Sequence, residues 1–211
     1  CHLKNVYDKS SHHHHTPEGS GSACIACHMP GKVYMGVDYR HDHSMRVPRP
    51  DISIKTGSPN ACTDCHTDRS ADWANSRLME WGIEFKNLRH QPAVSFREAT
   101  RGDVRAAPSL LHIALNKRNT NILKASAISH LGNLFPETAL DSLPVWLGSQ
   151  DPMIRMVAAE VAGQMPRQQR YALLKPLISD PVLSVRMVVA EQLAREPTAS
   201  NRAPELELLF E

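Results

Sequence analysis

The sequence predicts a mainly α-helical protein in which a loop-rich N-terminal module precedes an α-solenoid of helical pairs. Two observations support this prediction. The pattern Cys-x-x-Cys-His occurs twice in the first 66 residues, and a block of small apolar residues recurs at a step of 31 residues in the second half. We therefore expect a module at 1–84, a junction or irregular first repeat at 85–107, and about three helical repeats at 108–211, truncated at the C-terminus.

The two pentapeptides are Cys24-Ile25-Ala26-Cys27-His28 and Cys62-Thr63-Asp64-Cys65-His66. Two thiols at this spacing can each form a thioether with a vinyl group of a porphyrin, and the adjacent histidine then binds the iron. The pattern therefore predicts c-type haem. We expect thioethers at Cys24, Cys27, Cys62 and Cys65, and proximal iron ligands at His28 and His66.

The cysteines allow two other interpretations, a zinc site and disulfides. Paired Cys-x-x-Cys units also form four-thiolate zinc sites, but zinc leaves the histidine after each second cysteine unexplained. A disulfide across two residues is short and is usually redox-active rather than structural. Both are less consistent with the pattern than haem.

The fifth cysteine is Cys1, which His2 follows directly. We interpret the pair as the end of a third Cys-x-x-Cys-His unit, in which Cys1 forms a thioether and His2 is the proximal ligand. The alternative is a lipoprotein whose mature chain begins at a lipidated cysteine.

Histidine is abundant, with 12 residues, and nine of them lie in the first 66 positions. This surplus over the proximal ligands is what ligation by two histidines per iron requires. The run from His12 to His15 precedes a turn-rich TPEGSGSA segment, which allows it to fold back over a haem; a purification tag is the alternative. The irregular stretch after His28 contains His41 and His43, and its lack of a period is expected if porphyrin replaces a side-chain core. The weaker axial candidates there are Met29, Met35 and Met45.

The run ACIACHMPGKVYMGVDYRHDHSMRVPRPDISIKTGSPNACTDCHTDRSADWA resembles the haem region of periplasmic or secreted multihaem c-type cytochromes. In that family the haem module precedes helical repeats of the HEAT or tetratricopeptide type. The matching elements are the histidine cluster before a Gly-Ser turn, CHMP, Tyr-Met, Arg-x-Asp-His-Ser, PRPD, PNAC-x-x-CH and a following Trp. The resemblance is strong over residues 1–82. It implies a further Cys-x-x-Cys-His before the histidine cluster, and distal ligands at His15 and His43, with His12 behind them.

The segment from Ser70 predicts a helix that closes the haem region, with Trp73, Leu78, Trp81 and Ile83 as its apolar positions. The two tryptophans either pack at the junction between the modules or lie against porphyrin.

The C-terminal part contains an internal repeat. LKASAISHLG (123–132), IRMVAAEVAG (154–163) and VRMVVAEQLA (185–194) align at a step of 31 residues. Two blocks follow an Asp-Pro start, at Asp151 and Asp180, and second helices are expected around SLPVWLG and RYALLKPLI. Paired helices at this period are typical of a HEAT-like α-solenoid. PELELLFE at the end of the chain is expected to begin a further unit.

Three basic residues fall in register in the repeats: Lys124, Arg155 and Arg186. We expect them to pair with an aspartate of a neighbouring unit rather than to form a ligand-binding row. His112 and His130 are expected to be ordinary surface or core residues, and His90 is a weak ligand candidate.

Composition limits the remaining choices. The formal net charge is +2, and no apolar run is long enough to cross a bilayer. Because covalent haem attachment takes place after export, we expect a periplasmic or extracellular protein whose signal peptide lies outside this sequence. No nucleic acid is expected as a partner.

The expected function is electron transfer by low-potential bis-histidine haems, with the repeats as a scaffold or docking surface for redox partner proteins or neighbouring cytochrome subunits. The alternative is a multihaem oxidoreductase that acts on a small nitrogen or sulfur compound at an open axial site, with Tyr39, Arg40 and His41 as lining residues. A third possibility is a redox sensor with the repeats as its output.

Overall fold

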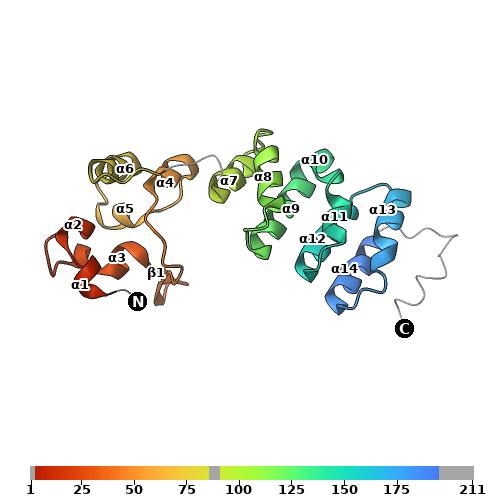
Figure 1. Cartoon of the computed structure of the whole chain (residues 1–211), viewed down its shortest axis with the longest axis horizontal. Helices are drawn as coiled ribbons and strands as arrows, with labels where there is room; N and C mark the ends of the chain where they lie inside the picture. The colour runs from red at the N-terminus through yellow and green to blue at the C-terminus, as the bar shows by residue number, and fades with distance from the viewer. Residues whose placement is uncertain (1–2, 86–90, 195–211) are drawn as a thin grey trace. The chain divides into compact units, whose positions relative to one another are not determined.

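The computed structural model describes residues 3–85 and 91–194. It contains two compact units, Cys1–Leu88 and Arg89–Glu211. Both are mainly helical (Figure 1). No helix in the described ranges combines the length and apolar character that a bilayer span needs.

The N-terminal unit is made of short elements joined by loops. Its helices are α1 (Lys4–Tyr7), α2 (Ser10–His13), the 3-10 turn η1 (Ser20–Ser22), α3 (Cys24–His28), α4 (Pro50–Thr56), α5 (Ala61–Cys65) and α6 (Ala71–Glu80), and its strands are β1 (Gly31–Tyr34) and β2 (Asp38–His41).

This unit has almost no side-chain core. Among residues 3–85 the buried positions are Pro50, Ser53, Ala74 and Leu78. Helices of four or five residues are too short to be stable by themselves, so the unit needs another source of apolar contact.

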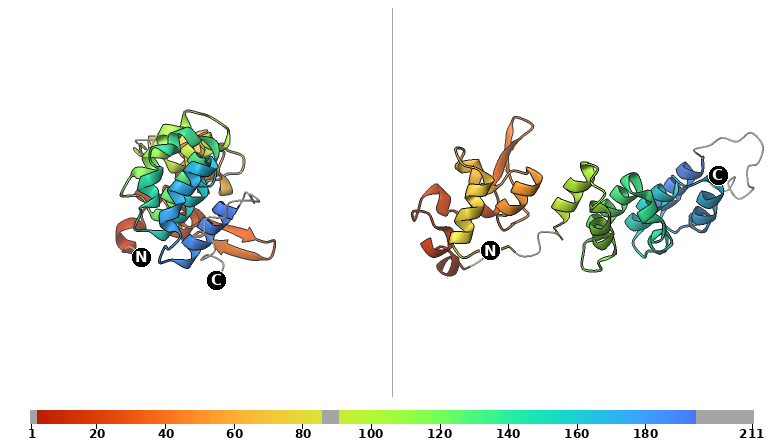
Figure 2. Two further views of the ribbon diagram at one scale, coloured as in Figure 1. Left: turned by 90° about the vertical axis from the view of Figure 1, so that its right-hand side faces the viewer. Right: turned by 90° about the horizontal axis from the view of Figure 1, so that it is seen from above.

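The stretch after His28 contains regular secondary structure that its sequence did not predict. Strands β1 and β2 pair antiparallel, from Gly31 opposite His41 to Tyr34 opposite Asp38, and the hairpin projects from the unit (Figure 2). The chain reverses at Met35 and Gly36, both with positive φ, and Val37 N–H donates to the Tyr34 carbonyl at 3.2 Å. The glycine was the signal for this turn, but the four-residue strands are too short to establish a period.

Helix α4 was also missed. Pro50 occupies its first turn and Gly57 ends it with a left-handed φ of 75°. Proline at the start and glycine just after the end are standard helix boundary signals. The seven residues between them are too few for a helical period.

The C-terminal unit contains α7 (Pro92–Thr100), α8 (Ala106–Leu115), α9 (Asn121–Leu134), α10 (Pro136–Leu140), α11 (Leu143–Leu147), α12 (Pro152–Ala162), α13 (Arg167–Leu174), η3 (Lys175–Leu177) and α14 (Leu183–Ala194). Helices α8, α9, α12 and α14 pack in series, each against the next. The expected second helices are α11 and α13, so the prediction of helical pairs is confirmed. The stretch 85–107 contains α7, whose Ala99 belongs to the core of this unit.

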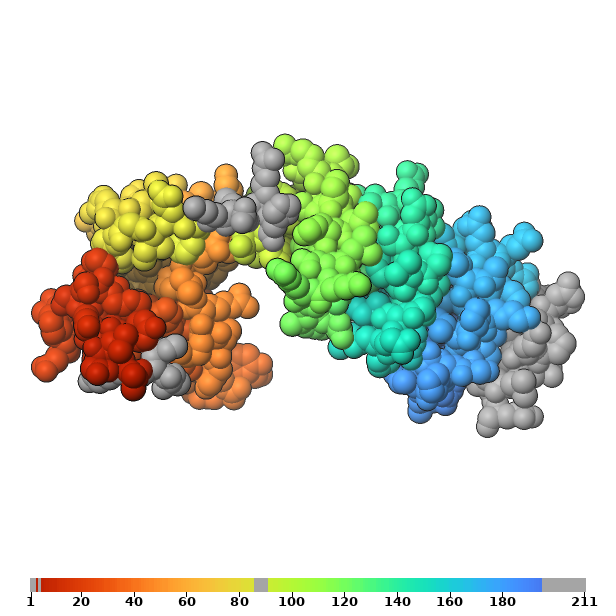
Figure 3. Space-filling model, viewed as in Figure 1, coloured from red at the N-terminus to blue at the C-terminus, as the bar shows by residue number. Residues whose placement is uncertain are grey.

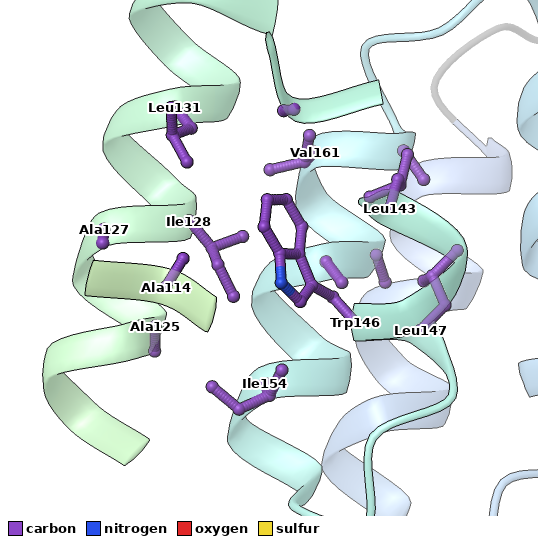
Figure 4. Close-up of a cluster of buried hydrophobic side chains, with 14 of the residues drawn as sticks. Ala114, Ala125, Ala127, Ile128, Leu131, Leu143, Trp146, Leu147, Ile154 and Val161 are labelled. Atoms are coloured by element: carbon purple, nitrogen blue, oxygen red, sulfur yellow. The ribbon is translucent and has the colours of Figure 1, made fainter. Parts of the chain in front are cut away.

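One continuous apolar core runs through the C-terminal unit. Trp146 of α11 is 3% exposed and lies among Ile128, Ile154 and Val161 (Figure 4). Since α9, α11 and α12 all contribute to this cluster, neighbouring repeats bury each other's apolar faces, as in a solenoid.

Two glycines bring successive repeats close together at the same register. A Cβ on Gly132 would overlap both γ-carbons of Val161, and a Cβ on Gly163 would overlap the side chain of Gln192. Both the glycines and their contacts are separated by the 31-residue step. The step therefore reflects one packing geometry used twice.

The three basic residues in register behave differently from one another. Arg155 forms a buried ion pair with Asp180, Nε to Oδ2 at 2.7 Å and Nη2 to Oδ1 at 2.9 Å, which confirms the expected pairing between units. Arg186 donates to the Asp180 carbonyl oxygen at 2.7 Å. Lys124 contacts Asn121 within its own helix at 3.4 Å, and it is Asn121 that bonds to Asp151 of the next unit.

The two Asp-Pro sequences also differ. Asp151 caps α12 by accepting from Met153 N and Ile154 N, with Pro152 in the first turn. Asp180 accepts from Val182 N at 2.8 Å, and α14 begins only at Leu183. The predicted start at Pro181 was therefore two residues early.

Candidate functional site

The N-terminal unit encloses a cavity of about 350 Å³. Cofactor pockets in proteins span about 300–1,000 Å³ and are mostly apolar. The cavity is lined by both Cys-x-x-Cys-His sequences and by the whole four-histidine run, together with Tyr7, Gly21, Ser22, Ala23, Ala26, Val47, Pro48, Ala61, Trp73, Ala74, Arg77, Leu78, Trp81, Ile83 and Phe85.

Each Cys-x-x-Cys-His sequence forms a short helix, α3 or α5. Residues at i and i+3 share one face of a helix, so the two cysteines of each sequence lie on the side that lines the cavity. The Asn60 side chain caps α5 by accepting from Thr63 N at 3.2 Å. None of these four cysteines is paired in a disulfide.

Burial raises the pKa of the Cys27 thiol, with smaller contributions from Cys65 and Cys24. Burial likewise raises the pKa of Cys62, with Cys27 the next contribution. Thiols of the two sequences are therefore close enough to affect each other's pKa.

The cavity contains two pairs of facing imidazole rings. The rings of His12 and His28 are 6.2 Å apart between centroids and nearly parallel, with an interplanar angle of 10°. Those of His15 and His66 are 6.1 Å apart at 33°. Each pair joins one histidine of the run to the histidine of one Cys-x-x-Cys-His sequence.

Hydrogen bonds orient two of these rings. His15 Nδ1 donates to the His13 carbonyl oxygen at 2.5 Å, and His28 Nδ1 donates to the Arg46 carbonyl oxygen at 2.9 Å. A carbonyl oxygen only accepts, so Nδ1 is the donor in each bond, and in the neutral ring Nε2 carries the free lone pair. Bonds of this kind orient histidines that bind metals.

The histidine run changes direction at His14. Helix α2 ends at His13, and His14 has a left-handed φ of 53°. Its ring stacks on Trp81 at 4.1 Å and 8°, which holds α2 against α6; the red and yellow segments are adjacent in Figure 3. His13 Nδ1 accepts from His15 N at 3.1 Å. Because of this turn, His12 lies near His28 and His15 lies near His66.

Helix α6 forms one wall of the cavity. Trp73, Arg77 and Trp81 are four residues apart and therefore share one helical face. The ring of Trp73 lies 4.8 Å from that of His66. Both tryptophans thus belong to the cavity wall.

Other candidates lie elsewhere. His43 is exposed and donates from Nδ1 to the His41 carbonyl oxygen at 2.8 Å. His41 donates from Nδ1 to the Met29 carbonyl oxygen at 2.7 Å. Neither lines the cavity, and the same holds for Tyr39, Arg40, Met29, Met35 and Met45. In the C-terminal unit, His130 stacks on Phe96 at 5.2 Å and His112 lies on α8.

Cys1, His2 and His90 lie outside the described residues, as does PELELLFE. Arg77, Val47, Pro48 and Phe85 line the cavity without having been singled out from the sequence. The spacing of Arg77 from the two tryptophans was a usable signal, because it repeats every four residues. The other three lie in loops, where no period exists.

Protein side chains alone do not assemble a metal site in the described ranges. No three His, Cys, Asp or Glu side chains there converge in a way that could hold an ion. A ligand that already supplies four donor atoms to its metal needs only two more donors from the protein. Each histidine pair contains two imidazole rings that could supply them.

Comparison with known proteins assigns part of the chain. Residues 100–194 match the family model of HEAT repeats. The match begins inside the stretch 85–107, which the sequence predicted to be a junction or an irregular first repeat. No curated protein and no solved structure matches the chain. The prediction of helical repeats is thus confirmed, and over residues 100–194 the chain is similar to HEAT repeats.

Proposed function

We propose that the N-terminal unit is a c-type cytochrome module that carries two bis-histidine haems and transfers single electrons. The observation that supports this most directly is the pair of facing imidazoles, His12 with His28 and His15 with His66, in a cavity that four cysteines also line.

The spacing of the rings fits a metal ion between them. An imidazole nitrogen binds a first-row metal such as zinc at about 2.0–2.1 Å, so two nitrogens on opposite sides of one ion are about 4 Å apart. Each ring centroid lies about 1 Å behind its nitrogen, which gives centroids about 6 Å apart. The observed separations are 6.2 and 6.1 Å.

The missing side-chain core agrees with the same proposal. The elements around the cavity are short, and few of their side chains are buried. A large apolar cofactor would supply the contact area that these elements lack. Cys24, Cys27, Cys62 and Cys65 would hold two porphyrins as thioethers, and the two histidine pairs would be the axial ligands.

Haem bound in this way supplies reversible one-electron exchange between ferric and ferrous iron, and bis-histidine ligation favours lower potentials than His-Met ligation. Because Nδ1 of His15 and of His28 each donates to a backbone carbonyl oxygen, Nε2 of each ring would be the atom available to the iron. Trp73 and Trp81 line the cavity and would shield one side of the bound group from water. Since covalent haem attachment follows export, the proposal also implies a periplasmic or extracellular location.

A third haem at Cys1 and His2 remains part of the proposal. His43 stays a distal candidate for a haem outside the cavity, since its Nε2 is not used by the bond to His41. We propose that the HEAT-like repeats are a scaffold or docking surface for a redox partner protein or a neighbouring cytochrome subunit, since such repeats commonly present extended binding surfaces.

The test is expression with a c-type haem maturation system. Intact mass and pyridine haemochrome spectra are expected to show covalent haem on both complete sequences, and electron paramagnetic resonance should show low-spin ferric iron. His12→Ala and His15→Ala are each expected to convert a different haem to high spin. The matched control, His43→Ala, should leave the haems of the two complete Cys-x-x-Cys-His sequences low-spin.

Three results would contradict the proposal. Absence of covalent haem would remove the cytochrome function. A low-spin spectrum that neither His12→Ala nor His15→Ala changes would remove the axial assignment. High-spin iron in the unmodified protein that binds nitrite, cyanide or hydroxylamine would favour the oxidoreductase alternative.

A further inference from the structure

Arg77 has an unusual position in the cavity wall. It lies on α6 between Trp73 and Trp81, four residues from each, and all three line the cavity. Among the described lining residues, Arg77 is the one member of the Arg, Lys, Asp and Glu group. A permanent cation in the wall of a mostly apolar cavity can contact a ligand of opposite charge.

The hydrogen bonds of Arg77 are incomplete. Its Nη2 donates to Glu80 Oε1 at 2.5 Å at the outer end of the side chain. Its Nε is buried and has no hydrogen-bond partner. A buried donor without an acceptor is unfavourable, and more so in a charged group. The orphaned Nε–H therefore marks the place of an acceptor.

We propose that Arg77 binds a carboxylate of the cavity's ligand. This inference rests on the proposed function, in which the ligand is haem and the carboxylate is a haem propionate. Arginine matches a carboxylate with a planar, bidentate donor set. Because Trp73 on the same face contacts the ring of His66, the propionate belongs to the haem on Cys62 and Cys65.

This contact makes the two haems inequivalent. A fixed positive charge near an iron favours the ferrous state, and hydrogen bonding around a haem is one means by which a protein sets its potential. Arg77 therefore raises the potential of the haem held by His15 and His66. The other haem has no matching cation among the described lining residues.

The experiment uses the full chain loaded with haem. Spectroelectrochemical titration of Arg77→Gln, Arg77→Lys and Glu80→Gln is compared with the unmodified protein. Arg77→Gln should lower the potential of one haem and leave the other unchanged, and Arg77→Lys should restore most of the shift because it keeps the charge. Glu80→Gln, which removes only the outer partner, should not lower either potential.

Several outcomes would overturn the inference. These are an Arg77→Gln protein with both potentials unchanged, one with both lowered equally, or an Arg77→Lys protein that matches the Gln variant. If Arg77→Gln fails to retain haem, resonance Raman spectra of Arg77→Lys are compared with the unmodified protein in the propionate-bending region, and an unchanged band refutes the contact. An unmodified protein without covalent haem would instead refute the proposed function itself.

Discussion

The buried ion pair between Arg155 and Asp180 gives the sharpest test of how the repeats hold together. Both side chains are less than a tenth exposed, and Asp180 accepts two hydrogen bonds from Arg155 and one from Val182 N. Asp180→Asn keeps the size of the side chain but leaves the guanidinium buried without a counter-charge. Removing one partner of a buried pair costs about 3–5 kcal/mol.

The expected effect on unfolding is large. For a unit of about 100 residues, each 1 kcal/mol shifts the Tm by about 4–8 °C, so Asp180→Asn should lower the Tm by more than about 10 °C. Calorimetry and urea titration followed by far-ultraviolet circular dichroism measure this. The matched control is Asp68→Asn, which breaks the exposed pair with Arg69 and should cost about 0–1 kcal/mol.

The pH dependence has a definite sign. The side-chain hydrogen bonds from Arg155 lower the pKa of Asp180 from its ordinary value of 3.8. The carboxylate therefore contributes its full stability above that value, and the contribution falls as the pH drops through the lower pKa of the folded state. Asp180→Asn should lack this part of the acid destabilisation. Equal stability of Asp180→Asn and Asp68→Asn would refute the role of the pair.

Three further predictions concern packing and cofactor attachment. Gly132→Ala should lower the free energy of unfolding, because the new Cβ would lie 2.9 Å from Val161 Cγ1 and 3.1 Å from its Cβ. Overpacking of this kind costs about 1–3 kcal/mol. The gain in helix propensity from glycine to alanine is about 1 kcal/mol and offsets only part of that cost. Gly148→Ala, whose nearest atom would be 3.5 Å away, should be neutral or stabilising in the same urea titration, and a stabilised Gly132→Ala would contradict the close approach. Replacing Cys62 and Cys65 together by serine should remove one haem by intact mass, whereas loss of both or neither would argue against independent attachment. Trp81→Leu should loosen the His14 stack and broaden the low-spin signal of the haem bound by His15, measured against Trp146→Leu, which should affect stability alone.

Much of the C-terminal unit was predictable because a solenoid repeats one local packing arrangement of helices. The 31-residue step placed α9, α12 and α14 within a few residues of their observed bounds. The ion pair of Arg155 followed from its register, but the contact of Lys124 did not. At the earlier repeat Asn121 makes the inter-unit bond to Asp151, and the sequence pattern does not reveal this exchange.

The cavity was only partly predictable. Both Cys-x-x-Cys-His sequences could be recognised because covalent attachment requires a strictly local pattern. The partners of His12 and His15 could not be deduced, because each pair joins residues that are 16 or 51 positions apart in the chain. Their pairing depends on the left-handed turn at His14 and its stack on Trp81.

The sequence alone determined the two attachment patterns, the surplus of histidine and the step of the repeat, since each is a property of neighbouring residues. The tertiary structure decided which imidazoles pair with each other, that both patterns share one cavity, and that Arg77 is the one Arg, Lys, Asp or Glu among the described residues that line it. These features depend on long-range packing of short elements, and local pattern does not encode it.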